Sequence, residues 1–144
     1  MQLKGIGVNM IALGSDHAGF PLKQEIMKHF DEIGVEYKDY GCYSPERFDY
    51  AIAAQKACDA VVSGDCDKAV LCCGTGIGIS MAANKVKGIR AAACSDYFSA
   101  KYTRLHNDVN KYRTYLSMYN DYMFDYDTVT DMFSLYIYRS FKAT

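Results

Sequence analysis

Residues 69–80 read Ala-Val-Leu-Cys-Cys-Gly-Thr-Gly-Ile-Gly-Ile-Ser. The first five form a short apolar run, which is typical of a buried β-strand. The three glycines that follow, at every second position, predict a tight turn, and a short helix is expected from Ser80 to Lys85. A strand that turns sharply into a helix is the repeating unit of an α/β fold.

The chain on both sides of this stretch repeats the alternation of strand and helix. Apolar runs predict strands at 10–13, 35–40 and 89–94, and apolar residues at helical spacing predict helices at 20–33, at about 49–63 and from residue 95 or 96 through Leu105. Short connections between such elements form right-handed crossovers, which make the sheet parallel and cover both of its faces. We therefore expect an α/β fold built on a parallel sheet.

The composition is that of a soluble globular protein of one domain. Of the 144 residues, 50% are hydrophobic and 23% are charged, which argues against disorder. The formal net charge of −1 gives no positive surface for nucleic acid or an anionic membrane. No apolar run reaches the roughly 20 residues that span a bilayer, and no signal-peptide pattern is found. The six cysteines are therefore expected to be reduced thiols in the cytoplasm.

Two motifs directly follow predicted strands, which is where parallel sheets bind ligands. They are Ser-Asp-His at 15–17 and the glycine loop at 74–78. Glycines let successive backbone N–H groups and a helix N-terminus approach an anion. The spacing of this loop matches neither a Walker A loop nor the dinucleotide fingerprint Gly-x-Gly-x-x-Gly.

Cysteine and histidine side chains beside these motifs are candidates for chemistry. Cys73 ends its strand next to a helix N-terminus, a position that favours a reactive thiolate, although free cysteines are also commonly buried as core residues. Cys72 should point to the opposite face and lie in the core. Asp16 can orient substrate hydroxyls and His17 can bind phosphate, or they are a turn residue and a surface histidine. The other cysteines lack paired metal-ligand spacing, so no metal site is predicted.

Several linked motifs occur in order along the chain. They are IALGSDHAGF at 11–20, DYGCYS at 39–44, CGTGIGISMAANK at 73–85, GIRAA at 88–92 and HNDVN at 106–110. Together they resemble the type B ribose-5-phosphate isomerases, a family that also includes the galactose-6-phosphate isomerase subunits. The resemblance implies a Rossmann-like three-layer α/β/α sandwich that interconverts ribose 5-phosphate and ribulose 5-phosphate through an enediolate.

The resemblance also implies roles for individual residues. Isomerisation needs a base for a carbon-bound proton and groups that stabilise the enediolate charge. Cys73 resembles the base, Thr75 its supporting hydroxyl, and His106 the acid or base that opens the sugar ring. No metal or organic cofactor is needed. The substrate-binding candidates are Asp16 for sugar hydroxyls, His17 for phosphate, Tyr50 or Tyr43, the glycine-loop residues Gly74, Gly76, Gly78 and Ser80, and Asn107.

Partners and alternative substrates follow from the same resemblance. The family builds its site across a dimer, in which the His106 region reaches the partner's cysteine loop, so a homodimer or a dimer of dimers is expected. A cysteine at position 73 favours ribose phosphate. The alternatives are a galactose- or allose-6-phosphate isomerase, which differs in pocket size, and a non-catalytic module that binds a sugar phosphate or a nucleotide.

The last 34 residues depart from the family pattern. They hold seven of the thirteen tyrosines and no glycine, and their two arginines match no motif of the arginine-rich segment with which the family grips phosphate. The tail has either diverged, or a changed reading frame has replaced the last strand and helix. We favour the second explanation because the break is abrupt and follows a strong motif.

We therefore divide the chain into an N-terminal extension (1–9), an isomerase core (10–110) and a divergent tyrosine-rich tail (111–144). Aromatic and other apolar residues recur at steps of three and four from Tyr112 to Tyr136, which predicts an amphipathic helix in the tail. Loss of the family's phosphate contacts would weaken substrate binding, so we expect impaired or absent activity.

Overall fold

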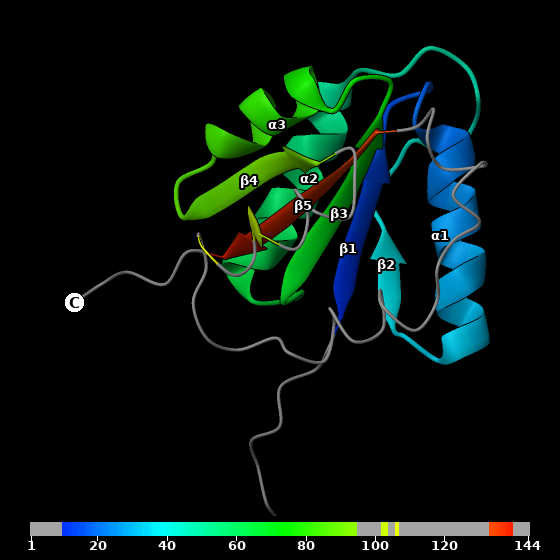
Figure 1. Cartoon of the computed structure of the whole chain (residues 1–144), viewed down its shortest axis with the longest axis horizontal. Coiled ribbons are helices and arrows are strands. Elements are labelled where there is room, and N and C mark those ends of the chain that lie inside the picture. The colour runs from blue at the N-terminus through cyan, green and yellow to red at the C-terminus, as the bar shows by residue number, and fades with distance from the viewer. Residues whose placement is uncertain (1–9, 95–101, 104–105, 107–132, 140–144) are drawn as a thin grey trace, which may run out of the picture.

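The computed structural model describes residues 10–94, 102–103, 106 and 133–139. Within these residues the chain forms strands and helices that alternate along most of its length (Figure 1). The strands are β1 (Ile11–Ser15), β2 (Tyr37–Asp39), β3 (Lys68–Cys73), β4 (Ile89–Cys94) and β5 (Phe133–Arg139), and the helices are α1 (Phe20–Ile33), α2 (Tyr50–Ser63) and α3 (Ile77–Asn84). The predicted α/β class is confirmed.

The strands form one sheet in the order β2-β1-β3-β5-β4. β1 runs parallel to β2 and β3, as predicted, whereas β5 runs antiparallel to β3 and β4 and departs from the predicted parallel sheet. From β1 the chain passes to β2 on one side and then to β3 on the other, so the strand order reverses between β1 and β3. A ligand site is therefore expected beyond the carboxyl ends of these two strands.

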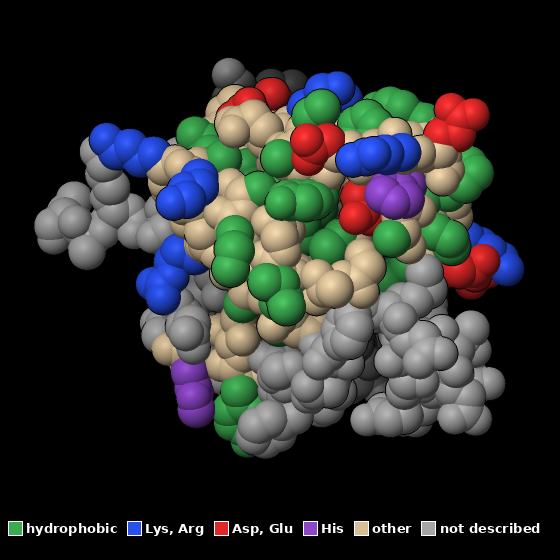
Figure 2. Space-filling view, turned by 90° about the horizontal axis from the view of Figure 1, so that it is seen from above, with side chains coloured by type: hydrophobic (Ala, Val, Ile, Leu, Met, Phe, Trp, Pro, Cys, Tyr) green, Lys and Arg blue, Asp and Glu red, His purple; other side chains and the backbone are tan. Residues whose placement is uncertain are grey.

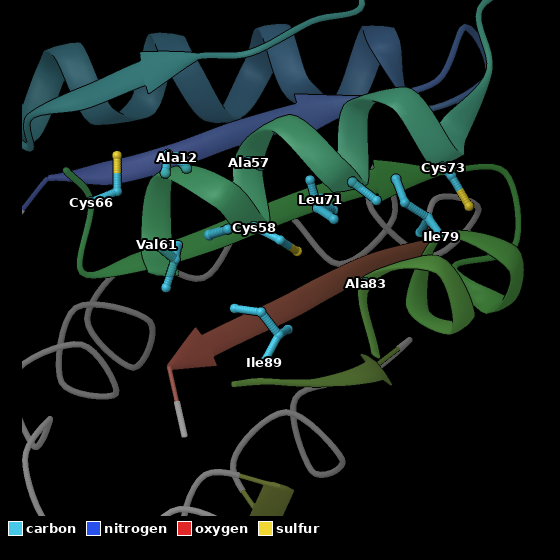
Figure 3. Close-up of a cluster of buried hydrophobic side chains, with 13 residues drawn as sticks. Ala12, Ala57, Cys58, Val61, Cys66, Leu71, Cys73, Ile79, Ala83 and Ile89 are labelled. Carbon is cyan, nitrogen blue, oxygen red and sulfur yellow. The ribbon is translucent and has the colours of Figure 1, made fainter. Parts of the chain in front are cut away.

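Helices cover both faces of the sheet and make it the middle of three layers. Ile11, Leu13 and Cys72 face α1 in one buried cluster. Leu71 and Cys73 face α2 and α3 in the other, which Figure 3 shows in close-up. Cys72 and Cys73 therefore point to opposite faces, as their neighbouring positions on a strand predict.

The ends of the first two helices follow from single residues. Pro21 occupies the first turn of α1, and Gly34 ends this helix with a left-handed φ of 71°. The carboxylate of Asp49 accepts the Ala51 N–H at 2.8 Å and caps the start of α2, and Gly64 ends α2 with a φ of 89°. These predicted starts and stops are confirmed.

The tail contributes a strand where its aromatic spacing predicts a helix. That prediction is wrong for residues 133–136, which belong to β5 between β3 and β4. Their sequence is rich in aromatic and aliphatic residues that suit strands, and pairing on both sides outweighs a helical spacing of poor helix formers. The rest of the predicted tail helix and the extension at 1–9 lie outside the described residues.

The segment after β4 is described only in part. Tyr102, Thr103 and His106 are helical, which agrees with the helix predicted from residue 95 or 96, and the rest of that helix lies outside the described residues. No helix in the described part of the chain is long and apolar enough to cross a membrane. The division of the chain at residue 110 stays a prediction.

Deletion of residues 133–144 should strongly destabilise the fold, because β5 pairs with six residues of β3 and with six of β4. Each backbone hydrogen bond contributes about 0.5–1.5 kcal/mol net, so a loss of several kcal/mol in the free energy of unfolding is expected. Urea denaturation followed by circular dichroism measures it. Deletion of residues 140–144 alone is the control, and equal stability of the two truncated chains would contradict the placement of β5.

Candidate active site

Two turns meet where the strand order reverses. The first joins β1 to α1, and its Asp16 N–H donates to the carbonyl oxygen of Cys72 at 3.2 Å. Gly19 closes this turn by donating its N–H to Asp16 Oδ1 at 2.7 Å. A Cβ atom on Gly19 would overlap the carbonyl group of Cys72 and lie 2.6 Å from the nitrogen of Cys73. Only glycine therefore lets the start of α1 pack against the end of β3.

The second turn wraps around the sulfur of Cys73. Cys73 is 5% exposed, and its Sγ accepts the N–H of Gly76 at 2.9 Å. Gly76 has a left-handed φ of 73°, which aims its N–H back at the sulfur and starts α3 at Ile77, three residues before the predicted start. Thr75 Oγ1 accepts the Ile77 N–H at 3.3 Å. An N–H directed at sulfur stabilises negative charge on that sulfur.

Two backbone N–H groups of this loop have no acceptor in the described part of the chain. The N–H groups of Gly74 and Thr75 donate to no acceptor among the described residues, and both residues are exposed. Ser80, in contrast, uses its N–H on Gly76 O at 3.1 Å and its hydroxyl on Ile77 O at 2.7 Å. Gly74 and Thr75 therefore keep backbone donors for an oxyanion, whereas both donors of Ser80 are already used.

The neighbouring thiol of Cys72 is not available for chemistry. Burial raises the pKa of Cys72 to about 12, and the positive charge of Lys23 only partly opposes this effect. Cys72 has no exposed surface. It is a core residue, as predicted, and stays protonated at neutral pH.

Tyr50 borders the same loop. It is the first residue of α2 and is 42% exposed, and its ring lies over Gly78, where a Cβ atom would approach Tyr50 Cζ to 2.9 Å. The structure thus places Gly78 and Tyr50 together beside Cys73's loop. Tyr43, the other tyrosine candidate, is more exposed and donates its hydroxyl to the carbonyl oxygen of Asp39 at 3.1 Å.

Asp16 and His17 lie on the β1–α1 turn. Oδ1 of Asp16 is used within the turn, and its second carboxylate oxygen accepts no hydrogen bond from a described residue. His17 is exposed, and its Nδ1 lies 3.3 Å from both the nitrogen and the oxygen of Phe48. Figure 2 shows acidic and basic side chains mixed with hydrophobic ones on the face seen from above. Asp16 is thus a turn residue with one oxygen left for a ligand.

His106 is not brought to Cys73 within one chain. It is exposed, and its ring packs edge-on against Tyr102 with the ring centroids 5.0 Å apart. In Figure 1 the yellow segments at 102–103 and 106 lie away from the end of β3 that carries Cys73. Asn107 lies outside the described residues. In the described part of the chain, no three His, Cys, Asp or Glu side chains gather in a way that could hold a metal ion.

The sequence does not predict a buried ion pair that lies beneath the site. Lys23 Nζ lies 2.7 Å from Asp39 Oδ1, and the lysine side chain has no exposed surface. A lysine on a helix is usually interpreted as a surface residue. The only signal in the sequence is the place of Asp39 at the start of the family-like stretch 39–44.

Known proteins resemble about two thirds of this chain. Residues 11–113 match the model of the ribose/galactose isomerase family. The chain is 53% identical over 100 residues to ribose-5-phosphate isomerase B of Escherichia coli strain K12, which covers 69% of this chain and 67% of that protein. It is 50% identical over 101 residues to the putative sugar phosphate isomerase YwlF of Bacillus subtilis strain 168, with 69% and 68% covered.

A solved structure extends this likeness to the fold. Ribose-5-phosphate isomerase B of Clostridium thermocellum superposes with a TM-score of 0.66 at 47% identity, covering 70% of this chain and 68% of that one. The family match ends at residue 113, so β5 comes from outside the matched residues.

Substitution Gly19→Ala should destabilise the chain, because the added Cβ overlaps the Cys72 carbonyl group. Gly19 has a φ of −84°, which any residue adopts, so the cost comes from overlap alone and should reach about 1–3 kcal/mol or more. Chemical denaturation measures it. Gly34→Ala, where the added Cβ meets no atom within 4 Å, serves as the control and should cost about 1–2 kcal/mol, the penalty of a left-handed φ without any overlap. Wild-type stability of Gly19→Ala would contradict the close packing.

Proposed function

Because the chain belongs to the ribose/galactose isomerase family, we propose that it interconverts ribose 5-phosphate and ribulose 5-phosphate with Cys73 as the base. The observation that carries this proposal is the position of the Cys73 sulfur. It lies at the carboxyl end of β3, accepts the N–H of Gly76, and is followed by two N–H groups that are open to a substrate oxygen. A base beside an oxyanion-binding loop is what aldose–ketose isomerisation requires.

The reaction follows from this arrangement. The thiolate of Cys73 takes the proton from C2 of the open-chain aldose, and the electron pair moves into a C1–C2 double bond while negative charge develops on O1. The N–H groups of Gly74 and Thr75 stabilise that charge. A proton then passes from O2 to O1, and Cys73 returns its proton to C1, which leaves a carbonyl group at C2. The Thr75 hydroxyl supports the thiolate.

Substrate contacts come from the β1–α1 turn and its neighbours. Asp16 accepts hydrogen bonds from sugar hydroxyls with its remaining carboxylate oxygen, and His17 binds the phosphate from its exposed position. Tyr50 borders the sugar beside Gly78. The family pattern adds Asn107 as a further substrate contact.

A second copy of the chain supplies His106 for ring opening in a homodimer. His106 is exposed and lies apart from Cys73 in its own chain, so a partner chain has to bring it to the site. Ile77 and Met81 of α3, directly after the Cys73 loop, are 55% and 63% exposed and offer an apolar surface for such a partner. All six cysteines are free thiols, which suits a reducing compartment, and we place the enzyme in the cytoplasm.

Replacement of Cys73 tests the chemistry. Cys73→Ala should lower kcat/KM for ribose 5-phosphate by about 100- to 10,000-fold, the usual contribution of a general base, while ribose 5-phosphate still binds. A coupled isomerase assay and titration calorimetry measure the two effects. Cys72→Ala, which removes the adjacent thiol on the other face, is the matched control and should stay active. Turnover by Cys73→Ala would contradict the assignment, and a wild-type chain that binds without turnover would favour the non-catalytic module.

The tail should reduce the efficiency of the enzyme. A chimera that carries a family-like C-terminal segment after residue 110 should have a lower KM than this chain, because each charge-assisted phosphate contact is worth about 1.5–3 kcal/mol, or about tenfold or more in affinity. The same coupled assay compares the two proteins. Equal kcat/KM values would show that the tail does not impair the site.

A further inference from the structure

Lys23 is a fully buried cation beneath the candidate active site. It lies in the first turn of α1 and has no exposed surface. Its Nζ donates to both carboxylate oxygens of Asp39, at 2.7 and 2.8 Å, and to the carbonyl oxygen of Cys42. The rings of Phe20 and Tyr43 lie beside it, with centroids 5.7 and 5.3 Å from Nζ. Lysine is almost never buried to this extent without such partners.

The segment that Lys23 holds is paired with the last residue of β1. Ser15 donates its N–H to Gly41 O at 2.6 Å and accepts the N–H of Cys42 at 2.9 Å. Asp39 Oδ1, which binds Lys23, also accepts the Gly41 N–H at 2.9 Å. The ammonium group therefore fixes the backbone that lies against Ser15, the residue directly before Asp16.

Lys23 also lies at the other end of the same turn. Its backbone N–H donates to Gly19 O at 3.0 Å, and Gly19 in turn donates to Asp16 Oδ1. The turn at 16–19 is thus held from α1 at one end and from the segment 39–42 at the other. Lys23 belongs to α1 and binds the segment 39–42 through its side chain. The charges of Lys23 and Asp16 both act on the thiol of Cys72, which agrees with an ammonium group close below the end of β3.

We propose that Lys23 is a positioning residue of the isomerase, which acts through Asp16 by fixing the turn at 16–19 so that its free carboxylate oxygen faces the sugar. This proposal rests on the proposed function, in which Asp16 binds sugar hydroxyls. Lys23 touches neither substrate nor Cys73. It acts through the geometry of the turn.

Stability alone does not explain an ion pair at this place. Two buried charges lose their hydration, and apolar residues of similar volume often give equal or greater stability. An ammonium group that binds two carboxylate oxygens and one carbonyl oxygen, however, fixes the relative position of all three groups. An apolar pair would fill the space without fixing that position.

Hydrogen exchange tests the coupling between Lys23 and the turn. Lys23→Met keeps the length of the side chain and removes its charge, and the exposed Lys28→Met on the same helix is the matched control. In Lys23→Met the amides of Asp16 and Gly19 should exchange about tenfold faster or more, the factor that corresponds to one lost hydrogen bond to a charged group, while amides of α2 keep their rates. Unchanged exchange at Asp16 and Gly19 would overturn the proposal.

Kinetics test the consequence for the substrate. Lys23→Met should raise KM for ribose 5-phosphate by about tenfold with a much smaller change in kcat, because Asp16 binds the sugar and Cys73 performs the proton transfer. The double variant Lys23→Met/Asp39→Leu replaces the ion pair by an apolar pair and should recover stability while KM stays high. A KM that returns to the wild-type value together with stability would show a purely structural role and overturn the proposal.

Hydrogen exchange and kinetics distinguish a failure of this proposal from a failure of the proposed function. If the wild-type chain does not turn over ribose 5-phosphate, the proposed function fails, and hydrogen exchange alone decides whether Lys23 fixes the turn. If turnover is present, the exchange rates and the KM values have to change together in Lys23→Met for the proposal to stand.

Discussion

The backbone contact between Gly19 and the end of β3 determines the shape of the active site. The start of α1 lies against the carbonyl group of Cys72 with no room for a Cβ atom, and the Asp16 N–H donates to the same carbonyl oxygen. This contact brings the Asp16 turn beside the loop that surrounds the Cys73 sulfur. Asp16 and Cys73, the proposed substrate contact and the proposed base, therefore share one end of the sheet because two backbones meet without side chains between them.

Support for this contact comes from one face of the sheet and from the strand next to β3 within the sheet. On one face, the buried ammonium group of Lys23 holds the segment that pairs with Ser15. Along the other edge of β3, Cys73 is in register with Phe133 of β5, a strand from beyond the residues that match the family. The tail therefore forms part of the scaffold of the site.

Local patterns in the sequence predict much of this structure. The apolar runs, the glycine loop, and the caps at Asp49 and Gly64 predict the strands and helices, and strand alternation predicts that Cys72 and Cys73 face apart. Two features depend on distant contacts and cannot be predicted in this way. β5 forms because two strands offer it hydrogen bonds, and Lys23 is buried because it pairs with Asp39 at the end of β2.

Deuterium incorporation tests proton transfer through Cys73 most directly. The wild-type chain is incubated with ribose 5-phosphate in D2O, and the sugar phosphates are followed by proton NMR. Deuterium is expected at C2 of the recovered ribose 5-phosphate and at C1 of ribulose 5-phosphate, because the proton on sulfur exchanges with solvent, and no incorporation is expected with Cys73→Ala. Isomerisation without deuterium, or equal incorporation by both proteins, would contradict proton transfer through Cys73.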